Sequence, residues 1–235
     1  MYKNLKILAL ITARGGSKGI PKKNIRLFLG KPLIYWTIKE ALKSGYEDKV
    51  VVDTDSAEIA KIARRYGAEV PFLRPKKLAT DKANSIDVLF NSVKWFRGRG
   101  QVFGIIVLLQ PTSPLRQRGD IDGTIKLLAK NGARAVVSVT DAFCSPLLMN
   151  VLPKNYSMKN FLSKRVINSR RQKLPKYFQL NGAVFTGYTD YIKKNNGFFG
   201  NKTFAYMMPR ERSVDIDDIY DFKFAESLHD KTLKG

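Results

Sequence analysis

Residues 13–24 read ARGGSKGIPKKN, a glycine-containing loop rich in cations that directly follows an apolar run. Glycines such as Gly15 and Gly16 let a backbone approach a ligand closely, and free N–H groups attract phosphate. The loop has neither the G-x-x-x-x-G-K-[ST] nor the G-x-G-x-x-G pattern. Its charge exceeds what a dinucleotide needs and predicts a triphosphate; the alternative is a strand-to-helix loop with solvated lysines. Its cations are Arg14, Lys18, Lys22 and Lys23.

The segment RSVDIDDIYD, residues 212–221, concentrates acidic residues in a strongly basic chain. Asp215 and Asp217 are two positions apart, so on an extended backbone both carboxylates point to one side. Together with phosphate oxygens they would form a hard-oxygen site suited to Mg²⁺. Asp218 and Asp221 fit the acid-rich start of a helix, which is the alternative explanation for the cluster. We expect the cationic loop and the aspartate pair to meet in one cleft.

Two further stretches carry groups that suit a polar ligand. In LLQPTSPLR, prolines stiffen the loop after an apolar run and orient Gln110, Thr112 and Ser113; a rigid turn is the alternative. In RRQKLP, Arg171 beside another arginine could grip a carboxylate bidentately, or it could be part of a solvated basic turn. Phe198 and Phe199 are of a type found more often in a core than in a ligand contact.

The elements that must position these residues alternate between strand and helix. Short apolar runs predict strands at residues 5–12, 49–56, 103–110 and 133–141, with helical periodicity between them. This alternation predicts an α/β fold, a Rossmann-like mostly parallel sheet with helices on both faces, in which ligands bind beyond the carboxyl ends of the strands.

The periodicity weakens after residue 141, and eight basic residues and no acidic one follow between residues 154 and 176. We therefore expect residues 1–140 and 177–235 to form the nucleotide-binding α/β domain. Residues 141–176 are expected to form an excursion available for dimerisation or for the second substrate.

The chain of 235 residues carries a formal net charge of +22, which favours anionic partners, nucleic acid among them. One cysteine and one histidine exclude a disulfide framework and a Cys/His zinc site. No apolar run is long enough to span a membrane, and a signal peptide would consume the first strand. We expect a cytoplasmic protein without a membrane partner. A nucleic-acid-binding protein is the rival class, although no recognised module or aromatic platform supports specific binding.

In this order, ARGGSKGIPKKN, LLQPTSPLR, RRQKLP with NGA, and RSVDIDDIYDF closely resemble the motifs of the acylneuraminate cytidylyltransferases, over nearly the whole chain. The resemblance implies a reaction of CTP with a nine-carbon 2-keto sugar acid, giving a CMP-sugar and pyrophosphate. It also implies a nucleotide-diphospho-sugar transferase type of fold and a homodimer, in which the excursion of one subunit completes the sugar site of the other.

The resemblance also implies a role for particular residues. Arg14, Ser17, Lys23 and Asn24 match triphosphate contacts, and Arg74, Ala83 and Ser85 match positions around the cytosine. Gln110, Arg171, Asn181, Phe185, Phe198 and Phe199 match the sugar site, and Asp215 and Asp217 match the metal pair. Arg14 and Lys23 would hold the phosphates during in-line attack, and the base would be Asp217 or a metal-bound hydroxide.

The chain departs from the sialic-acid pattern at Leu148, where a lysine is common, and at Leu180 and Phe185, where proline and tyrosine are common. The loss of a cation and a hydroxyl suits a less polar nonulosonate, such as legionaminate or pseudaminate, at least as well as N-acetylneuraminate. The related Kdo cytidylyltransferases carry an acidic residue at the strand end that here reads LLQPTSP. Its absence favours the nine-carbon branch, and a Kdo-type or other sugar nucleotidyltransferase is the alternative.

Overall fold

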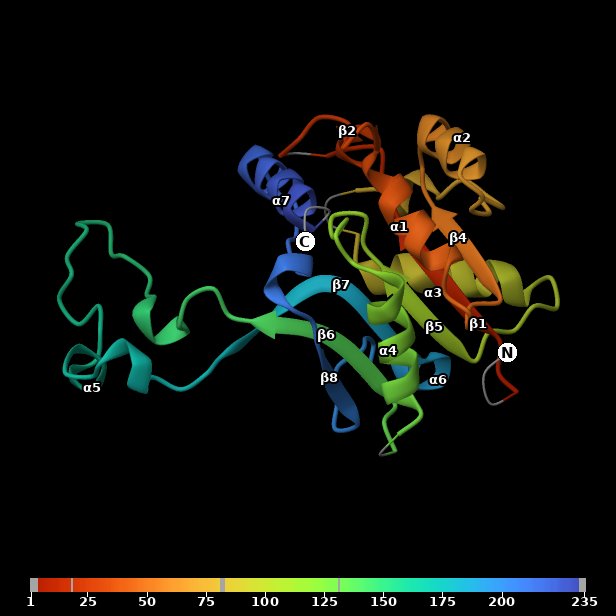
Figure 1. The fold of residues 1–235 in the computed structure, drawn as a ribbon. Helices are drawn as coiled ribbons and strands as arrows, with labels where there is room; N and C mark the ends of the chain where they lie inside the picture. The colour runs from red at the N-terminus through yellow and green to blue at the C-terminus, as the bar shows by residue number, and fades with distance from the viewer. Residues whose placement is uncertain (1–3, 18, 81–82, 131, 233–235) are drawn as a thin grey trace.

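The fold is built on a six-stranded sheet, seen in a computed structural model that describes residues 4–17, 19–80, 83–130 and 132–232 (Figure 1). The strand order is β4-β1-β5-β7-β6-β8, and β7 alone among them runs antiparallel to its neighbours. The predicted mostly parallel sheet is therefore confirmed, but no sequence signal indicated the direction of β7. The strands are β1 Ile7–Thr12, β4 Lys49–Asp53, β5 Ile105–Leu109, β6 Ala135–Asp141, β7 Phe178–Tyr188 and β8 Thr203–Met207.

Helices cover both faces of the sheet, as the alternating pattern predicted. In β1, Ala9 and Ile11 pack with α1, α2 and α4, whereas Leu8 and Leu10 pack with α3, so the strand is apolar on both sides. Within the described ranges no helix is both long and apolar enough to cross a bilayer. The helices are α1 Leu33–Leu42, α2 Ala57–Arg65, α3 Ser85–Arg97, α4 Arg118–Leu128, α5 Lys164–Ile167, α6 Thr189–Lys194 and α7 Ile219–Thr232.

A third, smaller core joins the two ends of the chain. It lies between α7 and a short hairpin, whose strands are β2 Leu27–Phe28 and β3 Lys31–Pro32. In Figure 1, α7 lies beside the segment that contains β2. The rings of Phe28 and Phe222 meet edge to face with centroids 5.4 Å apart. This packing brings the C-terminal acidic segment to the N-terminal cationic loop.

Residues 142–177 form a projecting segment, which we call the arm. It leaves the sheet after β6 and returns at β7, with Asp141 and Phe178 paired at its base, and it extends far from the sheet in Figure 1. The arm contains α5 and the short 3₁₀ turns η3 Pro146–Leu148 and η4 Arg171–Lys173. Several of its large apolar side chains are exposed, Val151 to 87%.

Glu47, in the turn between α1 and β4, is a buried carboxyl group outside the cleft described below. Both of its carboxylate oxygens are shielded from water and have no hydrogen-bond partner among the described residues. Burial raises its pKa to about 7, the charge of Asp122 acts in the same direction, and Ser44 opposes the shift. The folded state thus binds the Glu47 proton more tightly than the unfolded chain does, so stability is lost as the pH rises toward 7.

We therefore expect Glu47→Gln to raise the free energy of unfolding at pH 8 by on the order of 2 kcal/mol, because the neutral amide removes the cost of burying a charged carboxylate. The gain should be much smaller at pH 5, where Glu47 is protonated in the folded protein and ionised only in the unfolded chain. Urea unfolding at the two pH values measures the difference. Glu58→Gln, in the exposed ion pair with Lys22, is the control and should show no such pH-dependent gain. Equal effects at both pH values would contradict the assignment.

Candidate active site at the carboxyl ends of the strands

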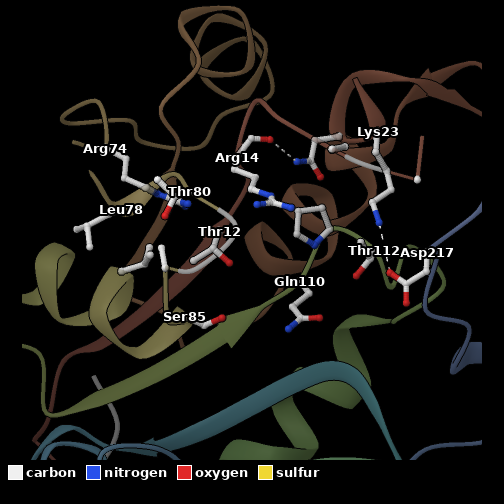
Figure 2. A pocket seen from close by; sticks show the side chains of 16 residues that line it. Thr12, Arg14, Lys23, Arg74, Leu78, Thr80, Ser85, Gln110, Thr112 and Asp217 are labelled. Carbon is white, nitrogen blue, oxygen red and sulfur yellow. Dashed lines mark hydrogen bonds and ion pairs between the residues drawn. The ribbon is translucent and has the colours of Figure 1, made fainter. Parts of the chain in front are cut away.

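A cavity of about 400 Å³ lies beyond the carboxyl ends of β1 and β5 (Figure 2). In this view Arg74, Leu78 and Thr80 occupy one flank and Lys23, Thr112 and Asp217 the other, with Arg14 and Gln110 between them. The position is the one expected for a ligand site in such a sheet. The predicted residues that line the cavity are Arg14, Ser17, Lys23, Asn24, Arg74, Ala83, Ser85, Gln110 and Asp217.

The cationic loop is held from within by its own polar groups. The Asn24 side-chain amide donates to the carbonyl of Arg14 at 2.9 Å, so Asn24 shapes the loop as well as lining the cavity. The N–H of Gly15 donates to Asp55 Oδ1 at 2.8 Å. In this structure the N–H of Gly15 is therefore occupied by Asp55, whereas the sequence predicted free N–H groups in the loop. Gly16 follows in the same turn, and Lys18 lies outside the described residues.

Lys23 connects this loop to the C-terminal acidic segment. Its ammonium donates to the carbonyl of Ile216 at 2.6 Å and lies 3.5 Å from Asp217 Oδ1. A Cβ atom on Gly19 would clash with the carbonyl of Asp217, so the close approach of the two segments requires glycine there. The prediction that Lys23 and Asp217 share one cleft is confirmed.

Asp215 lines a neighbouring cavity of about 310 Å³ with Phe143, Leu180 and Phe224. Its Oδ1 is buried and has no hydrogen-bond partner among the described residues. Burial raises the pKa of Asp215 and the charge of Asp217 adds to the rise, whereas a hydrogen bond with Thr112 and the charge of Lys23 lower it. The aspartates are close enough to interact, but they line different cavities, whereas strand alternation predicted one side for both.

Asp218 and Asp221 serve the start of α7, as the alternative reading of the acidic cluster proposed. Asp218 Oδ1 accepts hydrogen bonds from the N–H groups of Tyr220 and Asp221. Asp221 Oδ2 accepts from the N–H groups of Asp217 and Asp218. Asp218 and Asp221 thus cap the helix, and Asp221 also lines the cavity beside Asp215.

Arg74 is buried in the wall of the main cavity and is anchored by residues that no motif indicated. Its Nε donates to Asp53 Oδ1 at 2.5 Å and its Nη2 donates to the carbonyl of Asp53 at 2.8 Å. Ser92, from α3, donates to Asp53 Oδ2 at 2.6 Å. Asp53 ends β4, so a buried acid at a strand end was a signal that could have found it.

The strand β7 contains a bulge at the edge of the site. In the ladder with β6, Val137 pairs with Phe185 but Val139 pairs with Leu180. The register therefore shifts, and residues 181–184 of β7 are left out of this ladder. Gly182 has φ +67°, and a Cβ atom there would lie 2.9 Å from both Asp215 Oδ2 and Gln110 Oε1. Glycine is therefore required at the point where these two polar side chains converge.

Asn181 was predicted to contact a sugar, and it does line the cavity beside Asp215, but its amide has partners within the protein. Its side chain is 2% exposed and both ends of the amide are occupied. Oδ1 accepts from Ser138 Oγ at 2.7 Å and from the N–H of Ala183 at 3.2 Å, and Nδ2 donates to Ser213 Oγ at 2.9 Å. The amide therefore stabilises the bulge and is not free for a ligand.

The predicted aromatic wall separates into core and surface. Phe198 is buried in the core below α3, so its prediction as a ligand contact is corrected. Phe185 is half-buried with its ring centroid 5.6 Å from that of Phe198, and Phe199 is exposed in the loop after α6. The backbone of Arg171 lies in η4 of the arm, and its side chain lies outside the described part of the structure.

Comparisons with known proteins agree with this architecture. Residues 8–233 match the family model described as Cytidylyltransferase. The pseudaminic acid cytidylyltransferase of Campylobacter jejuni is 33% identical over 96% of this chain and 97% of its own length. The CMP-N,N'-diacetyllegionaminic acid synthase of Legionella pneumophila is 35% identical over 95% of this chain and 96% of its own.

A further relative, the N-acylneuraminate cytidylyltransferase of Escherichia coli, is 37% identical over 96% of this chain but only 52% of its own length. Among solved structures, a CMP:2-keto-3-deoxy-manno-octonic acid synthetase complexed with CTP superposes with a TM-score of 0.71 over 97% of this chain and 99% of its own, at 14% identity. That likeness shows the fold.

We expect Asn181→Ala to lower the free energy of unfolding by roughly 2 to 4 kcal/mol, because it leaves buried partners of the amide unsatisfied. Urea unfolding measures the loss. The control is Asn150→Ala, which removes an exposed hydrogen bond to the carbonyl of Phe161 and should cost less than about 0.5 kcal/mol. A loss no larger at Asn181 than at Asn150 would contradict the structural role.

Proposed function

This chain belongs to the cytidylyltransferase family, and on that premise we propose that it transfers the cytidylyl group of CTP to a nine-carbon 2-keto sugar acid. The chain is a nucleotidyltransferase, and the named relatives act on pseudaminic, legionaminic and N-acylneuraminic acids. The observation that carries the proposal is the cavity in which the cationic loop, the buried Arg74 and the carboxylate of Asp217 face a common space.

In the proposed arrangement the nucleotide spans this cavity from one flank to the other. Arg74 and Ser85 lie on the side that would take the base, and Arg14 and Lys23 lie where they can neutralise the phosphates (Figure 2). The anomeric hydroxyl of the sugar attacks the α-phosphorus, forming a new O–P bond as the bond to pyrophosphate breaks. The contribution of the protein is mainly alignment and compensation of charge.

We also propose that Asp215 and Asp217 hold Mg²⁺. The residues fit such an ion, because Asp215 presents a buried carboxylate oxygen without a partner among the described residues and Asp217 is its charged neighbour. When bound, Mg²⁺ would offset the negative charge of the phosphates. In this proposal Asp217 takes the proton of the attacking hydroxyl, which is supported by its 84% exposed side chain and its position in the nucleotide cavity.

The acceptor is proposed to be a nonulosonic acid of the legionaminic or pseudaminic type. The cavity beside Asp215 is lined in part by the apolar side chains of Phe143, Leu180 and Phe224, and it adjoins Gly182 and Gln110 through Asp215. Leu148 and Phe185 likewise replace a cation and a hydroxyl of the sialic-acid pattern. Apolar walls suit the acyl and methyl groups of a less polar sugar acid.

The function is tested by presenting the four nucleoside triphosphates with a set of 2-keto sugar acids, namely Kdo and N-acetylneuraminic, legionaminic and pseudaminic acids. Pyrophosphate release should require CTP, a nine-carbon acid and Mg²⁺, and a chelator should abolish it. Asp215→Asn should lower turnover by at least about 100-fold, since it removes a charge expected to act on the metal. The control Asp218→Asn removes a nearby charge but keeps a good helix cap, so it should retain turnover within about threefold.

Other outcomes would separate the parts of this proposal. Release with Kdo alone, or with a different triphosphate, would overturn the assigned substrates. Unchanged turnover in Asp215→Asn or in chelator would overturn the metal site. Salt-sensitive binding to random DNA without any turnover of CTP would favour the rival nucleic-acid-binding class.

We propose, in addition, that the chain forms a homodimer through the arm, whose partner copy completes the acceptor site. The support is the unusual surface of the arm, which combines exposed apolar side chains with a run of basic residues. Monomeric proteins rarely expose contiguous apolar surface of this kind without a partner. The exposed apolar residues of the arm include Met149, Val151, Leu152, Tyr156, Met158 and Ile167.

The double variant Val151→Glu/Ile167→Glu should shift the protein from dimer to monomer and lower turnover at the same time, because both changes place charge in an apolar contact. Light scattering coupled to size exclusion measures the mass. Val102→Glu changes an apolar residue outside the arm that is about as exposed as Ile167, and it should leave the dimer intact. A monomeric wild-type protein, or a double variant that remains dimeric, would contradict the proposal.

A further inference from the structure

Arg116 is a buried cation, although it lies in the loop between β5 and α4. Its side chain is 1% exposed, and its Nε is buried without a partner among the described residues. Burial lowers the pKa of Arg116 to about 10, while Asp120 and Glu40 act in the opposite direction from further away. Since desolvating a guanidinium is costly, an apolar residue of similar volume would be expected here if filling space were the only requirement.

The hydrogen bonds of Arg116 go to two main-chain carbonyls and one hydroxyl. Nη1 donates to the carbonyl of Gln110 at 3.2 Å and to that of Ala183 at 2.7 Å. Nη2 donates to Thr37 Oγ1, on α1, at 2.7 Å. A planar guanidinium can hold such acceptors in a fixed arrangement, which a lysine ammonium on a flexible stem does not reproduce.

The two carbonyls lie where the β5–β7 ladder ends. The pairing of β5 with β7 runs as far as Leu109 opposite Val184. Gln110 and Ala183 are the next residues on the two strands, and Ala183 belongs to the bulge of β7. Arg116 therefore links the strands at the position where the ladder no longer does.

One of the linked residues lines the proposed active site, and the other is the neighbour of a residue at its border. Gln110 lines the nucleotide cavity, and Ala183 follows Gly182, against which Asp215 and Gln110 converge. A change in the separation of the two strands would therefore move Gln110 and Gly182 relative to each other and alter the space that Asp215 occupies.

We propose that Arg116 is a positioning residue for cytidylyl transfer, fixing the separation of Gln110 and Gly182 and hence the place of Asp215 beside the nucleotide cavity. This inference rests on the proposed function. It assigns to Arg116 no contact with either substrate, so its loss should affect kcat more than the KM for CTP.

The test compares Arg116→Lys, which keeps the charge but loses the planar fork, with Thr37→Val, which removes only the bond from Nη2. Arg116→Lys should lower kcat by about 100-fold while the KM for CTP changes less than about threefold. Thr37→Val should stay within about fivefold of the wild type in kcat. Wild-type kcat in Arg116→Lys would overturn the proposal.

Chemical rescue supplies a readout that a purely structural role would not give. Arg116→Ala opens a space of the shape of guanidinium, so millimolar guanidinium chloride should restore turnover at least about tenfold and saturably. The same salt should not restore Lys23→Ala, whose cation lies outside this fork. If Arg116→Ala does not fold, the comparison of Arg116→Lys with Thr37→Val decides alone. Absence of rescue in a folded Arg116→Ala would count against the fork.

Hydrogen exchange separates this inference from the function on which it rests. Arg116→Lys should raise amide exchange in peptides covering residues 108–118 and 180–186 and leave β1 and β4 unchanged. If the wild type transfers no cytidylyl group but this local change is seen, the proposed function fails and the structural link stands. If the wild type is active and exchange is unchanged in Arg116→Lys, the positioning role fails.

Discussion

The structure depends on how one antiparallel strand is interrupted inside an otherwise parallel sheet. At residues 181–184 of β7 the ladder to β6 shifts register, which frees main-chain groups that must find other partners in a buried place. The amide of Asn181 and the hydroxyl of Ser138 take some of them, and the guanidinium of Arg116 takes the carbonyl of Ala183. With these groups satisfied, Gly182 can turn toward Gln110 and Asp215, and a polar site forms at the end of the two central strands.

The cations of the site are partly balanced by neighbouring acidic groups, whereas the chain as a whole carries a large positive charge. Within the cavity, Lys23 lies between the carbonyl of Ile216 and the carboxylate of Asp217, and Arg74 is already neutralised by Asp53. Arg14 also lines the cavity and would face the phosphates. The net charge of +22 is far larger than this set of residues requires, and much of it lies elsewhere, including the basic residues of the arm. Such a surface attracts anionic substrates at long range, an effect that salt screens.

Much of the fold could be predicted from the sequence because its signals are local. The run around Ala9 and Leu10 is apolar on both sides, and Ser56 caps α2 by accepting the N–H of Ile59. The cationic loop and Asp217 were also found, because charge and strand-end position are visible in the letters. Partners distant in sequence were not. The direction of β7, the commitment of Asn181 to Ser138 and Ser213, and the burial of Arg116 are decided by tertiary packing. Asn181 and Phe198 are of residue types that suit a sugar site. In the structure, however, the amide of Asn181 is hydrogen-bonded to Ser138 and Ser213, and Phe198 packs in the core.

The joint between Lys23 and Ile216 spans 193 positions of the chain. During synthesis, β1 and the cationic loop leave the ribosome long before the segment that closes their cleft is made. In the growing polypeptide the cationic loop therefore exists before the acidic segment that completes the cleft. Proteolytic loss of α7 and the segment before it would remove the same wall of the cleft, so the complete site requires a segment made long after the cationic loop.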